Sequence, residues 1–428
     1  MNLAIKVRCI TYNLNKRSAE IDFHKLIFDQ ESQNFNQLPD LLVIGFQEIA
    51  TLHLSFLSLN ALTINRLHHL FSRALSIKLS NLKNLDHHST ENLNQTDFYS
   101  LISSRTHGGL GLLIYARNHT IKRHIKNIQT SVVSLGLFNL LNNKGAIGIR
   151  LTLCPFINHK LESNLETCQQ EIITFVNAHL APNDNAIQAR NQNYQTILNR
   201  LLFQNHKTHH TIYDSSHLFV MGDLNYRITL TSPNSNGSKS LSIKSLTQFI
   251  LKAQYSKLVH DHDTLFNQHS SKRVLYGLRE GKINFKPTYK YHLGQLDTLV
   301  DFNHRLPGWT DRIFFASWSD NQLKENHHLR STVSHYQSIQ DYCHSDHKPV
   351  FATFIIPGYA TFSKTPKILS NQPLIIPDRW WKIKLWVGNI LDKLCGTGIL
   401  IVILIGFGNF KLGLLILGLG LLWNSLRY

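Results

Sequence analysis

Short apolar runs recur along the first 356 residues, and most have the length and composition of buried β-strands. They are rich in Val, Ile, Leu and aromatic residues and are bounded by Gly, Asn, Asp or Pro, which is typical of strands between turns. The predicted strands cover residues 5–14, 40–49, 109–117, 146–153, 172–180 and 217–225. Stretches with helical spacing lie between them, for example residues 57–80 and 186–205. Paired strands with intervening helices indicate two packed sheets with helices outside.

The composition of the chain changes after residue 356, and this change predicts its division into parts. One large α/β domain covers residues 1–356, a polar, Pro-containing linker and juxtamembrane segment covers 357–385, and an apolar tail covers 386–428. A domain of this size can bury a large core. Its polar, Asn-rich segments are predicted to be surface loops, and they lie at residues 81–97, 157–170 and 231–240.

The apolar tail predicts a C-terminal transmembrane helix. Residues 395–423 contain a single charged residue, Lys411, and about 20 apolar residues in a helix cross a bilayer core. Trp380, Trp381, Trp386 and Trp423 flank this run as interfacial residues do, and Lys382, Lys384 and Lys393 precede it, which favours a cytosolic main domain. A buried core helix is disfavoured because the segment is apolar on every face. Lys411 leaves a second arrangement open, in which two half-length segments turn at residues 409–411 within one leaflet.

The charge and the cysteines narrow the class of protein. The formal net charge is +17, from 44 Lys and Arg against 27 Asp and Glu. Such a surface is either simply solvated or faces an anionic partner, and charge alone does not choose among nucleic acid, membrane and phosphorylated substrate. The five cysteines are scattered without a CxxC pair, which argues against a disulfide framework or a zinc site and favours a reducing compartment. The N-terminus has no signal-peptide pattern.

Polar side chains stand where several predicted strands end. The clusters are Asn13 and Asn15, Gln47 and Glu48, Asn177 and His179, Asp223 and Asn225, Asp311 and Arg312, and Asp346 and His347. One such residue alone is usually a turn former, but six clusters favour one shared site, because ligand sites in layered α/β proteins gather where strand ends meet. The hard oxygen ligands suit Mg²⁺. These groups can supply the metal ligands, base and proton donors that phosphate-ester hydrolysis needs.

Seven motifs, TYNLN, GFQE, VNAHL, GDLNYR, FKPTYKY, PGWTDRIFF and SDHKPV, resemble in order the signature blocks of the inositol polyphosphate 5-phosphatases. This family belongs to the endonuclease/exonuclease/phosphatase superfamily, and the resemblance spans about residues 5–356. With the apolar tail, the chain is most similar to the tail-anchored fungal members that act on phosphatidylinositol 4,5-bisphosphate. The resemblance implies an α/β four-layer sandwich of two packed mixed sheets flanked by helices. It also implies Mg²⁺-dependent hydrolysis of the 5-phosphate to give phosphatidylinositol 4-phosphate.

The same resemblance implies roles for the strand-end residues. Asn13 and Glu48 would hold the Mg²⁺, and Asp346 would lie near it. Asp223 would accept a proton from the attacking water, and Asn225 would position water and phosphate. The remaining implied catalytic residues are His179 and His347, which would donate to phosphoryl oxygens, and Asp311, which would orient His347.

Seven further residues are implied to bind the substrate. Tyr289, Lys290 and Arg305 would contact the 4-phosphate, Asn143 and Lys144 would lie near the 1-phosphate, and Arg190 and Asn191 would lie at the site edge. Arginine suits bidentate phosphate binding, and lysine acts as a point charge. Many family members carry a lysine where this chain has Asn303, which predicts weaker 4-phosphate binding.

The sequence also predicts how the site is placed at a membrane, and it leaves alternatives for one loop and for the function. Residues 134–141 carry an apolar cluster shortly before Lys144, and they form either a core strand or a loop that dips into the bilayer. The tail predicts a single-pass protein of the endoplasmic reticulum membrane with a cytosolic, monomeric catalytic domain and no nucleic-acid partner. A superfamily nuclease is the main alternative; the charge favours it, and the PTYKY block and the tail count against it. A non-catalytic membrane tether is disfavoured because every expected catalytic position is occupied.

Overall fold

The computed structural model describes most of the chain, including all the predicted site residues. The described residues are 4–17, 21–27, 37–85, 98–154, 170–205, 208–231, 240–321, 330–358, 365, 367–369 and 374–425. Most of the three predicted Asn-rich loops and Cys168 lie outside these residues.

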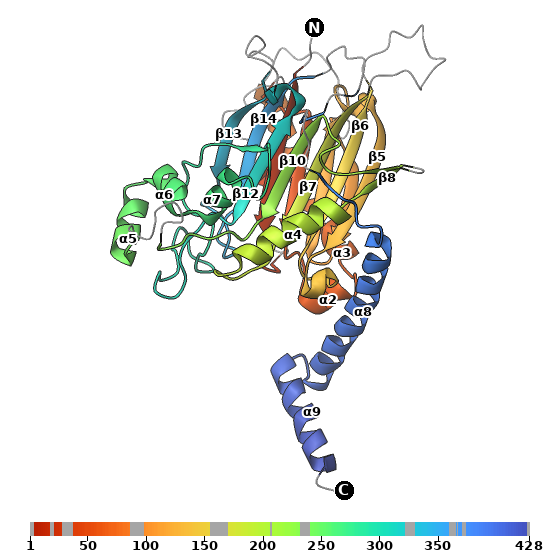
Figure 1. Cartoon of the computed structure of the whole chain (residues 1–428), viewed down its shortest axis with the longest axis vertical. Coiled ribbons are helices and arrows are strands. Elements are labelled where there is room, and N and C mark those ends of the chain that lie inside the picture. Colours follow the sequence, from red (N-terminus) through yellow and green to blue (C-terminus); the bar gives the residue numbers. More distant parts are fainter. Residues whose placement is uncertain are drawn as a thin grey trace.

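Twelve of the described strands form two sheets, as the sequence predicts. Their bounds are β1 Ile5–Asn13, β2 Leu41–Gln47, β3 Tyr99–His107, β4 Leu110–Arg117, β5 Ile125–Ser134, β6 Gly145–Leu153, β7 Glu171–His179, β10 His217–Asp223, β11 Arg279–Glu280, β12 Asp311–Ser317, β13 Thr332–Ser338 and β14 Val350–Ile356. The first sheet has the order β13-β14-β1-β2-β4-β3 and the second the order β11-β12-β10-β7-β6-β5 (Figure 1). Both are mixed, because β1 is parallel to β2 and antiparallel to β14, and β10 is parallel to β7 and antiparallel to β12. A small hairpin pairs β8 Phe203–Asn205 with β9 Thr208–His210.

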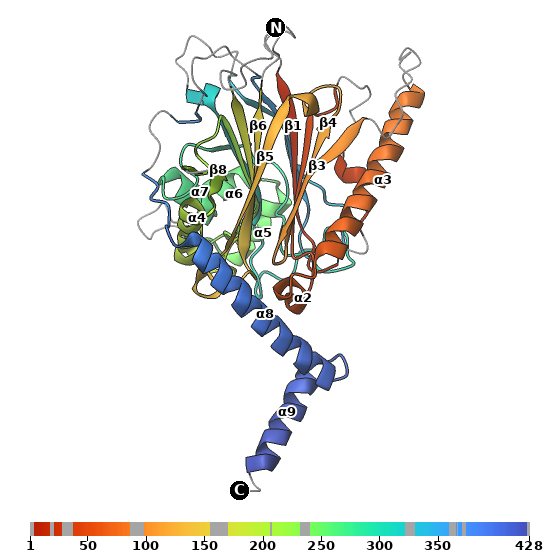
Figure 2. The ribbon, with the colours of Figure 1, turned by 90° about the vertical axis from the view of Figure 1, so that its right-hand side faces the viewer.

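The described helices lie outside the paired sheets. They are α1 His24–Ile27, α2 Leu52–Phe56, α3 Ala61–Leu85, α4 Ile187–Arg200, α5 Ile243–Leu251, α6 Tyr255–His262, α7 Thr264–Ser270, α8 Trp381–Ile405 and α9 Phe410–Ser425, with short 3₁₀ turns at Lys122–His124 (η4), Leu137–Asn139 (η5) and Trp318–Asn321 (η7). Between the sheets lies an apolar layer in which Phe219 stacks on Phe175. Helix α3 packs its Phe71 on the first sheet and α4 packs its Ile197 on the second, on opposite sides of the molecule (Figure 2). The predicted four-layer α/β sandwich is confirmed.

The strand registers bring the predicted clusters to one end of the sandwich. Asp223, the last residue of β10, pairs with His179 at the end of β7 and with Asp311 at the start of antiparallel β12. In the other sheet, Asn13 at the end of β1 pairs with Gln47 at the end of β2. Gln47 Nε2 then donates to Asn177 Oδ1 of the second sheet, 2.6 Å away. The two sheets are therefore joined directly beneath the strand ends.

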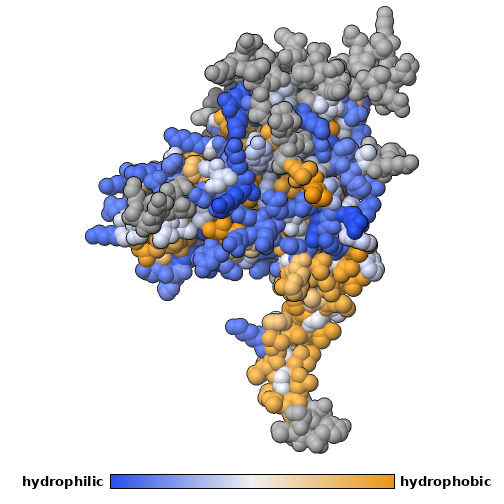
Figure 3. Space-filling model, viewed as in Figure 1, coloured by the Kyte–Doolittle hydropathy of each residue, from blue (hydrophilic) through white to orange (hydrophobic). Residues whose placement is uncertain are grey.

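The apolar tail is two helices rather than one continuous helix. Helix α8 begins at Trp381, inside the predicted linker, and ends at Ile405. The chain turns at residues 406–409, where Gly408 has φ +90°, a conformation that glycine adopts readily. Asn409 Oδ1 then accepts hydrogen bonds from the first turn of α9. This turn between α8 and α9 lies next to residues 409–411, where the second predicted arrangement of the tail places its turn. Helix α8 is long and apolar enough to cross a membrane, and Figure 3 shows apolar surface along the tail below the domain.

Candidate active site

Asp223 lies at the centre of the converging strand ends. Its Oδ2 accepts a hydrogen bond from Asn13 Nδ2 at 3.0 Å, and it lies 3.2 Å from His179 Nε2 and 3.9 Å from His347 Nε2. Burial alone would raise the pKa of Asp223, but the charge and hydrogen bond of His179 and the charges of His347 and Arg227 lower it overall. The carboxylate is therefore ionised and lies between two imidazoles. Gly222 precedes it at φ +139°, and a Cβ there would lie 1.9 Å from a backbone oxygen, so only glycine fits.

Asp311 and His347 form a buried carboxylate–imidazole pair. His347 Nδ1 donates to Asp311 Oδ2 at 2.9 Å, and the hydroxyls of Thr288 and Thr310 donate to the same oxygen at 2.7 and 2.9 Å. Burial alone would lower the pKa of His347, but the charge of Asp311 and its hydrogen bond raise it to about 9. His347 is thus an imidazolium at neutral pH, with its Nε2 directed toward Asp223.

Lys144 connects the second imidazole to the glutamate of the GFQE motif. Its Nζ lies 2.6 Å from His179 Nε2 and 3.8 Å from Glu48 Oε1. Burial lowers the pKa of His179, and the neighbouring lysine lowers it further. The charges of Asp223 and Glu48 and the hydrogen bond to Asp223 act on the pKa of His179 in the opposite direction, so the imidazole links Lys144 to the central carboxylate. Lys144 therefore lies against the catalytic cluster, and its contact with the 1-phosphate stays a prediction.

Arg227 belongs to the site although strand-end spacing does not single it out. Its guanidinium donates to Asn225 Oδ1 at 2.5 Å and lies 4.3 Å above the ring of Tyr289. Its Nε and NH1 are buried and have no hydrogen-bond partner within the described part of the chain. Asn225 is oriented from its other end, because its Nδ2 donates to the Leu180 carbonyl at 3.1 Å. In the sequence, the position of Arg227 as the last residue of the GDLNYR motif could have indicated that it belongs to the site.

The predicted 4-phosphate ligands surround one side of the cluster. Tyr289 packs its ring 4.5 Å from the His347 ring. Lys290 Nζ lies 3.4 Å from Asp346 Oδ2. Arg305 is at the rim, where its NH1 lies 3.0 Å from Asp184 Oδ1 and its side chain is 34% exposed. These cations are accessible or only loosely paired, as phosphate ligands need to be.

Two predicted edge residues have internal roles instead. Arg190 is fully buried and donates to the carbonyls of residues 181, 183 and 184. Asn191 donates to Gln268 and accepts from the hydroxyl of Tyr226. The Arg190 guanidinium thus holds the loop that presents Asp184 to Arg305, and its predicted contact with the substrate stays a prediction. Asn143, by contrast, is exposed beside Lys144.

The predicted metal ligands fit a hard divalent cation. Asn13 Oδ1 accepts a hydrogen bond from Asn15 N at 3.0 Å and retains a second lone pair. The side-chain nitrogens of Lys16, Lys144 and His179 lie 3.6 to 4.0 Å from the oxygens of Glu48, which leaves ligand positions open. Asp223, Asp311 and His347 also have potential ligand atoms within 4.8 Å of one another. That second set is less suitable, because a protonated imidazole paired with its own carboxylate does not bind a metal.

Comparison with known proteins gives the same fold and a consistent set of relatives. Residues 10–353 match the family model described as endonuclease/exonuclease/phosphatase family 2. Phosphatidylinositol 4,5-bisphosphate 5-phosphatase A of Mus musculus is 29% identical over 263 residues, 60% of this chain and 23% of the mouse protein. Inositol-1,4,5-trisphosphate 5-phosphatase 1 of Schizosaccharomyces pombe is 26% identical over 352 residues, 82% of this chain and 27% of the yeast protein. The chain thus spans about a quarter of the length of these relatives.

One solved structure is similar over nearly its whole length. It is the inositol polyphosphate 5-phosphatase domain of SPsynaptojanin, in complex with inositol (1,4)-bisphosphate and calcium ion. The TM-score is 0.63, with 24% identity and 93% of each chain covered. At this identity the similarity establishes the shared fold, and the chemistry has to be argued from the site itself.

Proposed function

The chain belongs to the endonuclease/exonuclease/phosphatase family 2, and we propose that it is a phosphoinositide 5-phosphatase that converts phosphatidylinositol 4,5-bisphosphate to phosphatidylinositol 4-phosphate. Its main support is the geometry at Asp223, an ionised carboxylate within 4 Å of both His179 and His347. A base and positive donors arranged around one point suit the attack of water on a phosphate ester. The named activities of the similar proteins favour the 5-phosphate of an inositol ring.

In the proposed mechanism, Asp223 and Asn225 hold the attacking water. Because its pKa is lowered, Asp223 is a weak base, so it orients the water and takes its proton late, as a loose phosphoryl-transfer transition state permits. His347 donates from Nε2 to a phosphoryl oxygen, and Asp311 keeps the imidazole protonated. Arg227 and Lys144 offset the negative charge that develops on the remaining oxygens.

Mg²⁺ is the proposed metal, with Glu48 and Asn13 as its protein ligands. Bound there, it would act as a Lewis acid on a phosphoryl oxygen. Carboxylate and amide oxygens are the ligands this ion prefers, and it binds readily through one or two protein groups plus substrate phosphate.

The proposed setting is the cytosolic face of the endoplasmic reticulum, with α8 and α9 as the membrane anchor and a monomeric catalytic domain. Helix α8 is long and apolar enough to cross a membrane. Leu137 and Phe138 are 61% and 81% exposed in the loop before Lys144. Exposed apolar side chains beside a phosphate site suit a loop that dips into the bilayer.

Phosphate release from a defined substrate panel tests this function. We expect the full-length protein in detergent micelles to release phosphate from phosphatidylinositol 4,5-bisphosphate and inositol 1,4,5-trisphosphate, and not from inositol 1,4-bisphosphate, the matched control without a 5-phosphate. Chelation with EDTA should lower the rate by about a hundredfold or more, because the Lewis acid contributes several kcal/mol. Added Mg²⁺ should restore it. Faster cleavage of duplex DNA than of either inositol substrate would instead favour the nuclease, which the +17 charge permits.

Asn303 gives a prediction about 4-phosphate binding. Its side chain bonds Asp301 at the surface, two residues before Arg305. We expect Asn303→Lys to lower KM for phosphatidylinositol 4,5-bisphosphate about two- to fivefold, since an exposed charge contact contributes about 0.5–1 kcal/mol. The control substrate is phosphatidylinositol 5-phosphate, whose KM should not change. An equal fall for both lipids would mean that the new charge attracts the membrane rather than the 4-phosphate.

A further inference from the structure

Helix α8 contacts the catalytic domain along the loop that carries Lys144. We propose that α8 is a brace for the loop of residues 136–144 and that Asp392 is a positioning residue for Lys144. The kinetic part of this inference rests on the proposed phosphatase function. The structural part stands on the contacts alone.

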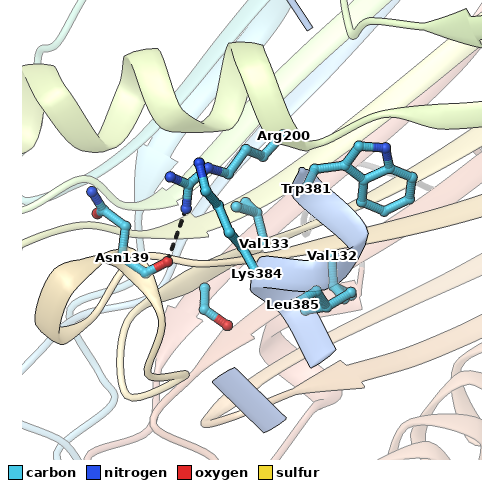
Figure 4. Close-up of a pocket in the computed structure, with 8 residues that line it drawn as sticks. Val132, Val133, Asn139, Arg200, Trp381, Lys384 and Leu385 are labelled. Carbon is cyan, nitrogen blue, oxygen red and sulfur yellow. Dashed lines mark hydrogen bonds between the residues drawn. The ribbon is translucent and has the colours of Figure 1, made fainter. Parts of the chain in front are cut away.

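The brace begins at the N-terminal end of α8, where Figure 4 shows Arg200 and Lys384 beside the loop residue Asn139. Asp378 Oδ2 lies 2.9 Å from Arg200 Nε and 2.6 Å from Lys384 Nζ, and Asp378 Oδ1 accepts from Trp380 N at 2.9 Å. Arg200, at the end of α4, also donates from NH1 to the Asn139 carbonyl at 3.0 Å. One arginine therefore ties the start of α8 to the loop.

The middle of α8 lies directly on the loop. Gly388, Asp392 and Gly396 are buried and are spaced four residues apart, so they share one face of the helix. A Cβ at Gly388 would lie 2.3 Å from the Leu140 carbonyl oxygen, which means that the helix and the loop backbone are in contact. Asp392 is 1% exposed, and its Oδ1 accepts a hydrogen bond from the backbone N–H of Asn142 at 3.0 Å.

A short path leads from this hydrogen bond to the catalytic cluster. Asn142 is two residues before Lys144 in a turn closed by two backbone bonds, Leu135 N to Lys144 O at 2.8 Å and Gly136 N to Leu141 O at 2.9 Å. Lys144 Nζ in turn lies 2.6 Å from His179. Because the turn is closed, a shift at Asn142 moves Lys144 as well.

The carboxylate of Asp392 also indicates where the membrane-facing part of the tail begins. A charged residue is unfavourable among lipid chains, whereas here it caps a buried N–H of the domain. Helix α8 also packs on α2 (Figure 2), and Gly396 is the last of its buried residues. One face of the first four turns of α8 thus packs on the catalytic domain, and we place the start of the bilayer-facing part of the tail after Gly396.

Two substitutions at Asp392 in the full-length protein in detergent micelles test the brace. Asp392→Leu removes the acceptor, and we expect kcat/KM for soluble inositol 1,4,5-trisphosphate to fall about tenfold, since small displacements of a positioned group lower rates steeply. Asp392→Asn keeps an acceptor oxygen and should stay within about twofold of the unchanged protein. A soluble substrate is used so that membrane insertion does not enter the rate. Leu394→Ala is the matched control on the exposed side of α8, where Leu394 is 65% exposed.

Hydrogen exchange at the Asn142 amide gives a readout that needs no catalysis. Exchange should be at least about tenfold faster in Asp392→Leu than in Asp392→Asn, since the amide loses its partner. Unchanged exchange, or unchanged kcat/KM with faster exchange, would overturn the brace. If Asp392→Leu does not fold, Asp392→Ala replaces it, because alanine also lacks the acceptor and favours a helix. Failure of the proposed function would appear separately, as no phosphate release by the unchanged protein.

Discussion

Asp223→Asn is expected to reduce kcat for phosphate release by at least about a thousandfold, because a positioned base contributes about 10²–10⁴ and the carboxylate charge also orients the attacking water. Asparagine has nearly the same shape and keeps an oxygen that can accept from Asn13 Nδ2, now 3.0 Å from Asp223. The backbone at Gly222 is unaffected by the substitution. The fold and the membrane attachment should therefore be retained while the chemistry is lost.

The measurement is single-turnover phosphate release with saturating protein, accompanied by thermal melting and vesicle flotation. Asp261→Asn is the control, because Asp261 is a surface carboxylate on α6 that is 38% exposed beside His260. The control should retain full activity. If Asp223→Asn still releases phosphate at a tenth of the normal rate or more, the water is held and deprotonated by another group, and the central role of Asp223 is wrong.

The strand-end clusters were predictable because their signal is local. An apolar run followed at once by Gly222 and Asp223 marks a strand that stops at a turn, and Asn13 and His179 likewise come at the end of predicted strands. The ends of the parallel strands β7 and β10 lie at one edge of their sheet, where antiparallel β12 begins, and the register of these strands sets which residues lie opposite each other. The family motifs added the individual roles, which spacing alone left open.

The rest of the site depends on contacts that no local pattern carries. The hydroxyls of Thr288 and Thr310 converge on Asp311 although residues 288 and 311 are 23 positions apart. The motif around Arg190 predicts a residue at the site edge. In the structure its guanidinium is buried instead, because it donates hydrogen bonds to carbonyls of the 181–184 loop. Composition cannot separate a guanidinium that binds phosphate from one that holds a backbone loop.

The apolar tail is a clearer example of contacts that a local sequence pattern cannot predict. Its hydropathy predicts a membrane helix, and α8 meets that description. However, one face of its first four turns packs on the protein, where Asp392 accepts a hydrogen bond from the backbone of Asn142, 250 positions earlier in the chain. A faint signal was present in the sequence, since Gly388, Asp392 and Gly396 form a stripe of small and polar residues along one helix face. Such a stripe suits close packing on a protein surface better than contact with lipid.

Asp311→Asn is expected to lower kcat about a hundred- to a thousandfold at neutral pH, because it removes the charge that keeps His347 protonated. In the unchanged protein the pKa of His347 is raised from 6.5 to about 9. The imidazolium is therefore present below pH 9, and activity should fall as the pH rises through about 9. The ion pair of His347 with Asp311 also stabilises the folded protein. Its contribution to the free energy of unfolding is complete below about pH 6.5 and is lost as the pH rises through 9.

Without the carboxylate charge, burial becomes the dominant influence on the imidazole, and burial lowers the pKa of His347. The alkaline limb of the kcat profile should then move from about pH 9 to below pH 7, and the NMR titration of the His347 ring should move with it. Thr310→Val is the matched control: it removes a neutral hydrogen bond of 2.9 Å to the same oxygen but leaves the charge. Its alkaline limb should stay within about one pH unit of the unchanged protein, because losing one neutral hydrogen bond costs about 1 kcal/mol. An Asp311→Asn profile that still ends near pH 9 would assign that limb to a different group, and His347 would then not be the proton donor.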